Sequence, residues 1–96
     1  MFVLITYDVN MTSPAGAKRL RSVSKACQNH GTRVQNSVFE CVLTEVQYVN
    51  LKNELEGLID QKHDSIRFYV LGKNWKRKVE TIGKDTGIDV TGELII

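Results

Sequence analysis

Residues 2–9 read Phe-Val-Leu-Ile-Thr-Tyr-Asp-Val, a nearly continuous run of apolar and β-branched side chains. Such a run is typical of a strand that is buried on both faces. Asp8 stands where this strand is expected to end, and the polar, turn-forming segment Asn10–Pro14 follows it. The stretch therefore predicts a buried strand with a carboxylate at its carboxyl end.

A helix is predicted after this loop. Ser13 supplies a capping hydroxyl, and Pro14 is compatible with the first helical turn. One face of the helix carries five residues at helical spacing: Ala17, Leu20, Val23, Ser24 and Cys27. The opposite side carries three basic residues: Lys18, Arg21 and Lys25. Gly31 is a fitting end for this helix.

Two strands and a second helix are predicted next. Arg33–Leu43 has the composition of strands, and Asn36-Ser37 is expected to form a bend or tight turn. Thr44 and Gln47 form a capping box that begins a helix ending near Gln61. The apolar stripe of this helix contains five residues: Tyr48, Leu51, Leu55, Leu58 and Ile59.

Ser65–Leu71 is predicted to be the next strand. The order strand, helix, strand, strand, helix, strand predicts an α+β sandwich with the ferredoxin-like βαββαβ topology. The whole chain is expected to be one domain, with its core in residues 1–72. In residues 73–96 we expect a basic helical turn over Trp75–Ile82 and a short strand over Glu93–Ile96, which must pair with an existing sheet edge.

Length and composition agree with a small globular domain of 96 residues, 42% hydrophobic and 25% charged. No apolar run reaches the roughly 18 residues that span a bilayer, and the N-terminal apolar run lacks the basic lead of a signal peptide. Cys27 and Cys41 are expected to be reduced, buried thiols. These features predict a cytoplasmic protein with no membrane partner.

The net charge of +2 hides four blocks of alternating sign. Residues 1–39 carry +4, residues 40–64 carry −4, residues 65–84 carry +5 and the last twelve carry −3. This alternation can separate a basic surface from an acidic one. A polyanion is therefore a possible partner despite the small total charge.

Asp8 is the first candidate for chemistry. A carboxylate at a strand end, beside a polar loop, suits a hard cation such as Mg²⁺. The residues alone favour a capping role for Asp8 towards Asn10–Ser13 over a metal role. The remaining acids are expected to be solvated, so one chain offers an incomplete metal site. If Asp8 binds a metal, a second copy of the chain must supply the other half.

The basic side chains of the first helix are candidates for phosphate binding. Lys18, Arg21 and Lys25 form one stripe, and Arg19 lies on another flank. A solvated helix face is the alternative, but the helix has no acidic residue, which favours nucleic acid. Trp75 lies among lysines and an arginine. It could stack on a base between these cations or simply anchor a basic tail, and the sequence favours neither role.

Four segments together resemble the CRISPR-associated protein 2 family. They are Tyr7-Asp8-Val9-Asn10, Lys18-Arg19-Leu20-Arg21, the run Gly31–Glu40 and Ser65-Ile66-Arg67-Phe68-Tyr69. The most specific part is the Val-Gln-x-Ser-Val-Phe-Glu motif within residues 34–40. The resemblance covers most of residues 1–72 in the right order.

The resemblance implies a ferredoxin-like homodimer that exchanges a C-terminal strand and acts with CRISPR-associated protein 1 in spacer acquisition. It also implies an Mg²⁺-dependent endonuclease that hydrolyses RNA, double-stranded DNA or both, and it reverses the preference for Asp8 towards catalysis and metal binding. The family's other functional positions map onto five residues implied to contact nucleic acid: Tyr7, Arg19, Arg21, Arg33 and Phe39.

Two further readings stay open. In the first, the dimer is a non-catalytic adaptor whose basic face holds duplex DNA while its partner performs integration. In the second, the chain is an RNA-binding ferredoxin-like module, which needs exposed aromatic residues on central strands. The run Val38-Phe39-Glu40 lacks that aromatic pattern.

Overall fold

A computed structural model describes residues 1–72 and residue 80. The elements in chain order are β1 (Phe2–Asp8), α1 (Pro14–Gln28), β2 (Gly31–Gln35), β3 (Val38–Val42), α2 (Glu45–Leu58) and β4 (Ser65–Leu71). This order confirms the predicted ferredoxin-like βαββαβ arrangement. The predicted basic turn (apart from Glu80, which lies in neither helix nor strand) and the predicted C-terminal strand lie outside the described residues.

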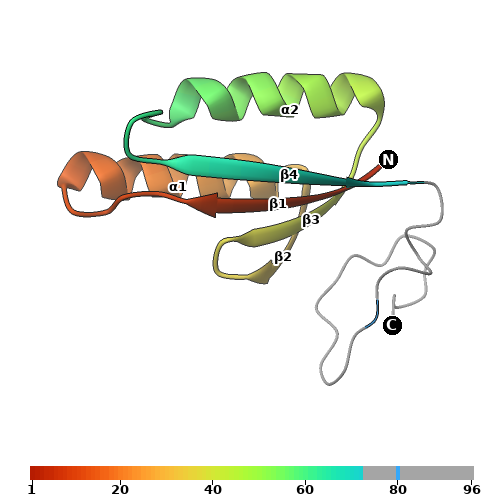
Figure 1. Ribbon diagram of the computed structural model, residues 1–96, viewed down its shortest axis with the longest axis horizontal. Helices are drawn as coiled ribbons and strands as arrows, with labels where there is room; N and C mark the ends of the chain where they lie inside the picture. The colour runs from red at the N-terminus through yellow and green to blue at the C-terminus, as the bar shows by residue number, and fades with distance from the viewer. Residues whose placement is uncertain (73–79, 81–96) are drawn as a thin grey trace.

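The four strands form one antiparallel sheet in the order β2-β3-β1-β4. β1 is a central strand with β3 on one side and β4 on the other (Figure 1). Its residues on the helix side are buried, but Leu4 and Thr6 are only half-buried and Asp8 is exposed, so the predicted burial of this strand on both faces is only partly confirmed. In the part of the chain that the structure describes, β2 and β4 are the two edge strands.

Both helices cover the same face of the sheet (Figure 1). The core between them contains residues of both layers: Val3, Ile5, Tyr7, Val23, Cys27, Phe39, Cys41, Leu51 and Leu55. The alternate residues of β1, which include Leu4, Thr6 and Asp8, lie on the other face. We call this second surface the open face. The stripe predicted for the second helix is thus confirmed as core, and that of the first is confirmed for Leu20, Val23 and Cys27 but not for Ala17 and Ser24.

The helix boundaries differ from the predicted ones for local reasons. α1 ends at Gln28, and its C-cap Asn29 lies two residues before Gly31. Gly31 lies in β2, where a Cβ atom would come within 2.4 Å of both Cys41 Sγ and the Glu40 carbonyl oxygen. The sequence therefore needs glycine at this position for close packing of β2 on β3, and not to end the helix.

α2 begins at the predicted capping box. The Thr44 amide donates to Gln47 Oε1 at 2.9 Å, and the Gln47 amide donates to Thr44 Oγ1 at 3.1 Å. The helix ends at Leu58 and not near Gln61. It stops early because the following loop has another set of bonds, in which the Asp60 amide donates to Asp64 Oδ2 at 2.8 Å.

Both cysteines are free and fully buried, as predicted. Burial raises the pKa of the Cys27 thiol to about 12 and that of the Cys41 thiol to about 11. The thiols are therefore protonated at neutral pH and unreactive. Within the described residues, no helix combines the length and the apolar character needed to cross a membrane.

Candidate metal and nucleic-acid site

Asp8 is the last residue of β1, and its side chain is exposed. The strand register places Asp8 opposite Ser65 and Thr6 opposite Arg67, all on the open face. The flanking residues Tyr7 and Val9 are buried in the core. The core therefore fixes the backbone of the strand end, while the carboxylate projects from the sheet.

A polar hollow of about 300 Å³ surrounds this carboxylate. Its lining comes from two adjacent strands and consists of Thr6, Tyr7, Asp8, Ser65, Arg67 and Tyr69. Four of these residues carry a hydroxyl group, although that of Tyr7 is bonded to the Asn36 carbonyl, and the hollow also has one carboxylate and one guanidinium. These groups can bind water, a hard cation or an oxyanion.

The loop after Asp8 does not use the Asp8 carboxylate as a cap. Its amides have other acceptors: Asn10 N donates to Asp64 Oδ1 at 3.0 Å, and Thr12 N donates to Asn10 Oδ1 at 2.9 Å. Ser13 Oγ accepts from Gly16 N at 3.2 Å and caps α1. Among the side-chain hydrogen bonds of the described residues, none is accepted by the Asp8 carboxylate. The capping role considered for Asp8 therefore has no support here, and its carboxylate is available for a ligand.

Asp64 is the buried acid of this region, with a side chain that is 0% exposed. Its two oxygens accept from Arg19 Nε at 2.7 Å, Arg19 Nη2 at 3.3 Å, Asn10 N at 3.0 Å and Asp60 N at 2.8 Å. The Arg19 guanidinium lowers the pKa of Asp64 to about 2; burial opposes this effect, and the two amides support it. The expectation that the acids other than Asp8 are solvated is thus wrong for Asp64.

The Asp64 carboxylate joins its own loop to two segments far earlier in the sequence, α1 and the loop that precedes it. It links α1 to the loop between α2 and β4, and the Asn10 amide ties the loop after β1 to the same carboxylate. Arg19 keeps 22% of its side chain exposed. A contact between Arg19 and nucleic acid stays a prediction, because in the folded chain this guanidinium already has a carboxylate partner.

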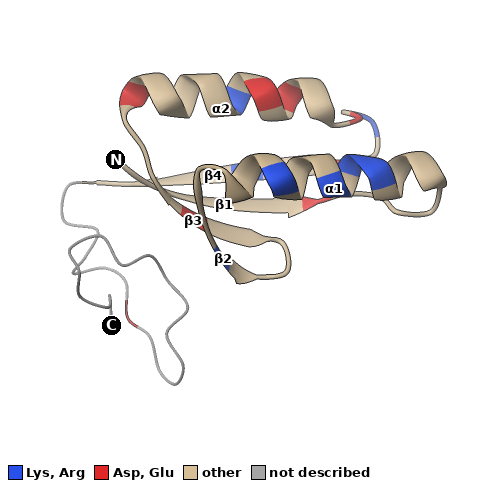
Figure 2. Cartoon of the chain, turned by 180° about the vertical axis from the view of Figure 1, so that it is seen from behind, with Lys and Arg blue, Asp and Glu red and all other residues tan. Residues whose placement is uncertain are grey.

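The basic stripe predicted on α1 is exposed, because Lys18, Arg21 and Lys25 all lie on its outer surface. Figure 2 shows basic residues along α1, and acidic residues predominate along α2. α1 contains no acid that could neutralise the stripe locally. The stripe can therefore bind phosphates, although α1 covers the face of the sheet opposite the Asp8 hollow.

Three residues implied by the family resemblance lie on the helix-covered face. Tyr7 and Phe39 are buried, with ring centroids 6.1 Å apart, and Tyr7 Oη donates to the Asn36 carbonyl at 3.2 Å. Arg33 lies 5.3 Å from the Phe39 ring centroid and bonds to Ser24 Oγ. In this structure these rings pack the core, and their contact with nucleic acid stays a prediction.

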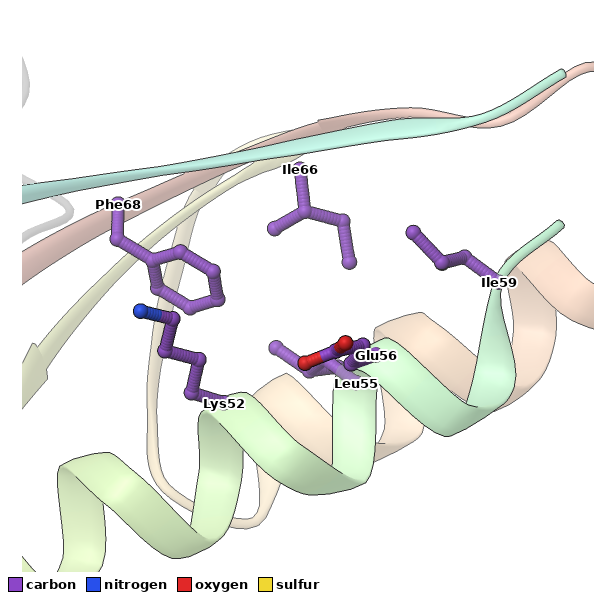
Figure 3. Close-up of a pocket in the computed structure, with 6 residues that line it drawn as sticks. All are labelled: Lys52, Leu55, Glu56, Ile59, Ile66 and Phe68. Atoms are coloured by element: carbon purple, nitrogen blue, oxygen red, sulfur yellow. The ribbon is translucent and has the colours of Figure 1, made fainter. Parts of the chain in front are cut away.

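A second hollow lies between α2 and β4 and has a volume of about 140 Å³. Figure 3 shows Ile66 and Phe68 pointing from β4 towards the helix, where they face Leu55 and Ile59. Lys52 and Glu56 lie at its side. The lining is mainly apolar and has no hydroxyl group, so this hollow suits hydrophobic contact and not phosphodiester chemistry.

Together these features define a small ferredoxin-like α+β protein with an exposed carboxylate at the end of its central strand and a basic helix on the opposite face. The chain belongs to the family of CRISPR associated protein Cas2, whose family model matches residues 1–79. It is 58% identical to a protein from Halalkalibacterium halodurans named CRISPR-associated endonuclease Cas2, over 99% of both chains. It is 51% identical to the CRISPR-associated endoribonuclease Cas2 of Chlorobaculum tepidum, over 100% of both chains.

The fold agrees with solved structures of the same family. The crystal structure of Streptococcus pyogenes Cas2 at pH 6.5 matches 86% of this chain and 100% of that chain, with a TM-score of 0.76 and 61% identity. A second crystal structure, titled cas2, matches 100% of this chain and 98% of that chain, with a TM-score of 0.69 and 31% identity.

Sequence reasoning missed two residues of this region. Asp64 precedes β4, and its partner Arg19 lies 45 residues away, so no local pattern indicates the pair. Arg67 follows the alternation of β4, but only the register with β1 shows that it lies beside the Asp8 hollow. The position of Arg67 beside Asp8 could be predicted only if the pairing of β4 with β1 were known.

Proposed function

We propose that this protein is a metal-dependent endonuclease that hydrolyses phosphodiester bonds, with Asp8 as its catalytic and metal-binding residue. The observation that carries the proposal is the exposed Asp8 carboxylate at a rigid strand end, in a polar hollow and without a bond to its own loop. The names endonuclease and endoribonuclease given to similar Cas2 proteins support the same class of activity.

The residues of the hollow fit Mg²⁺. This cation takes oxygen ligands, keeps several waters and is usually held by one or two carboxylates. Asp8 supplies one carboxylate, and the hydroxyls of Thr6 and Ser65 line the same hollow. Within residues 1–72 and residue 80, no group of three or more His, Cys, Asp or Glu residues gathers into a metal site. We propose that a second carboxylate comes from another copy of the chain.

When bound there, Mg²⁺ would polarise the phosphate and lower the pKa of the attacking water. The chain's own residues do the rest. Asp8 supplies the negative charge that holds the cation at a fixed place, because its backbone belongs to the central strand. The Thr6 and Ser65 hydroxyls can donate to or accept from a water in the hollow and orient it.

The basic stripe of α1 would bind the nucleic-acid backbone. Lys18, Arg21 and Lys25 are exposed and have no acid on their helix. Contacts between cationic side chains and phosphates supply affinity without sequence readout. The substrate class is therefore double-stranded DNA, RNA or both.

We include a homodimer and CRISPR-associated protein 1 among the proposed partners, and spacer acquisition in the cytoplasm as the setting. The open face supports dimerisation, since it carries exposed apolar side chains, including Val42 and Tyr69, which are 39% and 45% exposed. Two open faces in contact would bury these side chains and bring two Asp8 residues near one interface. The proposed exchange of a C-terminal strand concerns residues outside the described part of the chain.

The test is Mg²⁺-dependent cleavage of defined RNA and DNA duplexes by the wild-type protein and by Asp8→Asn. We expect cleavage by the wild type, no cleavage after chelation of Mg²⁺ and background cleavage by Asp8→Asn at unchanged nucleic-acid affinity. Glu54→Gln is the matched control, because Glu54 is an exposed acid on α2, away from the hollow. Cleavage by Asp8→Asn at the wild-type rate would overturn the proposal.

The second candidate is a non-catalytic adaptor dimer that binds DNA for its partner. The basic stripe on α1, which faces away from the Asp8 hollow, favours this role. If Asp8→Asn supports spacer acquisition as well as the wild type does, while charge removal on α1 abolishes it, the adaptor function is correct.

A further inference from the structure

Arg67 stands next to Asp8 on the open face of the sheet. Figure 3 shows Ile66 and Phe68 pointing from β4 towards α2, so the alternate residues of β4 lie on the other face. The register pairs Arg67 with Thr6 and Ser65 with Asp8. Arg67 and Asp8 are therefore diagonal neighbours across two adjacent strands, a separation of about 7–8 Å between backbones.

The guanidinium of Arg67 is not needed to neutralise an acid within the described chain. Its side chain is exposed and donates to Tyr69 Oη at 3.5 Å. No carboxylate of residues 1–72 forms an ion pair with it. Tyr69 lines the same hollow, and its hydroxyl helps to hold the guanidinium there. Among the described residues Arg67 thus has no counter-ion, and a cation in that state beside an available carboxylate is suited to an anionic ligand.

We propose that Arg67 binds the phosphate group whose ester bond is broken at Asp8. This inference rests on the proposed function. Arginine presents two parallel N–H donors that match two phosphate oxygens, which lysine cannot do. Asp8 would fix the side of the phosphate at which the cation lies. Arg67, which lies on the adjacent strand β4, would bind the non-bridging oxygens of that phosphate.

The reaction in question is simple hydrolysis. The oxygen of water forms a new bond to phosphorus, and one bridging P–O bond breaks. Water loses one proton, and the leaving oxygen of the nucleotide gains one. The distribution of negative charge over the non-bridging oxygens changes between the substrate and the transition state. A hydrogen-bond donor fixed beside these oxygens in their transition-state position lowers the barrier. Arg67 supplies this donor without taking or giving a proton.

The first measurement is the steady-state kinetics of cleavage with Mg²⁺ for the full chain. Arg67→Gln should lower kcat/KM about 10- to 100-fold, and Arg67→Lys should recover part of this loss, because it restores the charge but not the paired donors. Lys52→Gln is the matched control: it removes one exposed positive charge from α2, on the other side of the sheet. We expect its kcat/KM to stay near that of the wild type.

The second measurement does not depend on cleavage. Binding of a labelled duplex is followed by fluorescence anisotropy over a salt series in the Asp8→Asn background. Adding Arg67→Gln should weaken binding and reduce the slope of log affinity against log salt by about one phosphate contact. Adding Lys52→Gln should change neither quantity. A role of Arg67 in folding alone would not change this slope.

The outcomes separate the two proposals. If Asp8→Asn cuts like the wild type, the proposed function fails. If Asp8→Asn is inactive but Arg67→Gln has the kinetics and salt slope of Lys52→Gln, only the phosphate role of Arg67 is wrong. If Arg67→Gln loses activity and its salt slope decreases while its thermal unfolding is unchanged, Arg67 is the phosphate-binding residue of the site.

Discussion

At the scale of single residues, the Asp8 site depends on Asp64, a residue that does not line the hollow. Asp64 accepts from Arg19, from the Asn10 amide and from the Asp60 amide, and so fixes the two loops next to the ends of β1 and β4. Asn10 is only two residues from Asp8. A change at Asp64 therefore keeps every side chain that lines the hollow but releases the loop that follows Asp8.

We expect Asp64→Asn to destabilise the protein by about 3 kcal/mol, because it leaves the Arg19 charge without its buried partner. The asparagine NH₂ group would also face one of the N–H groups that now donate to Asp64, and two donors cannot form a hydrogen bond. Chemical denaturation at pH 7 measures this loss. Glu54→Gln, at an exposed site on α2, should change stability by less than about 0.5 kcal/mol.

The same carboxylate predicts a pH dependence of stability. The pKa of Asp64 falls from its ordinary value of 3.8 in the unfolded chain to about 2 in the folded protein. Its stabilising effect is therefore complete above about pH 4 and is lost as the pH falls towards 2. Asp60, whose pKa is also lowered, adds to the slope of the wild type in this range. Chemical denaturation between pH 5 and 2 should show that the free energy of unfolding changes less steeply with pH in Asp64→Asn than in the wild type. Equal slopes would contradict the lowered pKa of Asp64.

Which site residues the sequence reveals depends on whether their signal is local. Asp8 is a candidate because a carboxylate ends an otherwise apolar strand, but that pattern alone favours a cap, and only the family resemblance favours a metal role. The stripe of Lys18, Arg21 and Lys25 follows from helical spacing. Asp64 and Arg67 were missed, since their roles arise from partners in other elements. Local patterns contain no information on such long-range pairs.

At the scale of elements, the contact between α1 and the loop after β1 requires glycine at position 16. A Cβ atom there would lie 1.9 Å from the Asn10 carbonyl oxygen, 3.0 Å from its carbon and 3.2 Å from Met11 Cα. These are backbone atoms, so they cannot move away as a flexible side chain can. The first turn of α1 therefore packs directly on the loop that Asp64 also holds.

We expect Gly16→Ala to destabilise the protein by about 1–3 kcal/mol, although alanine is the better helix former. Gly57→Ala is the matched control in α2, where a Cβ atom meets nothing within 4 Å. That change should stabilise the protein by about 0.5 kcal/mol through helix propensity alone. Thermal unfolding of both variants checks the pair, and a stabilised Gly16→Ala variant would show that the loop can move away.

The elements themselves could be predicted from the sequence because each has its own periodicity and end signals. The capping box at Thr44 and the strand Ser65–Leu71 are both confirmed. The ends of the helices were less predictable. α2 stops at Leu58 because the loop amide of Asp60 bonds to Asp64, a tertiary contact that no helix signal contains.

At the scale of the whole molecule, the sheet has two unlike faces. The helices cover one face with the core. The open face presents Asp8, Arg67 and Tyr69 towards one end of β1 and the exposed Val42 at the other end. Within residues 1–39, Asp8 is the only acid. We therefore expect each chain of the proposed dimer to supply one carboxylate of a pair for Mg²⁺, at the edge of the open face.

Metal binding and dimerisation should therefore be linked. In the proposed dimer, two facing Asp8 carboxylates would repel each other, and Mg²⁺ between them would relieve this repulsion while gaining a second carboxylate ligand. By mass action, a cation that binds only the dimer must tighten it. We expect the dimer dissociation constant of the wild type to fall as Mg²⁺ is added. NaCl at equal ionic strength is the control, because it screens charge without binding between the carboxylates.

Asp8→Asn separates this linkage from dimerisation as such. The variant removes the repulsion and the ligand charge together, so it should dimerise well without Mg²⁺ and show no further response to the cation. Analytical ultracentrifugation of both proteins across a Mg²⁺ series, with cleavage assayed on the same samples, measures both properties. If Mg²⁺ tightens the wild type and Asp8→Asn equally, the cation acts elsewhere on the dimer. If it tightens neither while the wild type still cleaves, each chain must bind its metal alone, and the shared site between two Asp8 residues is wrong.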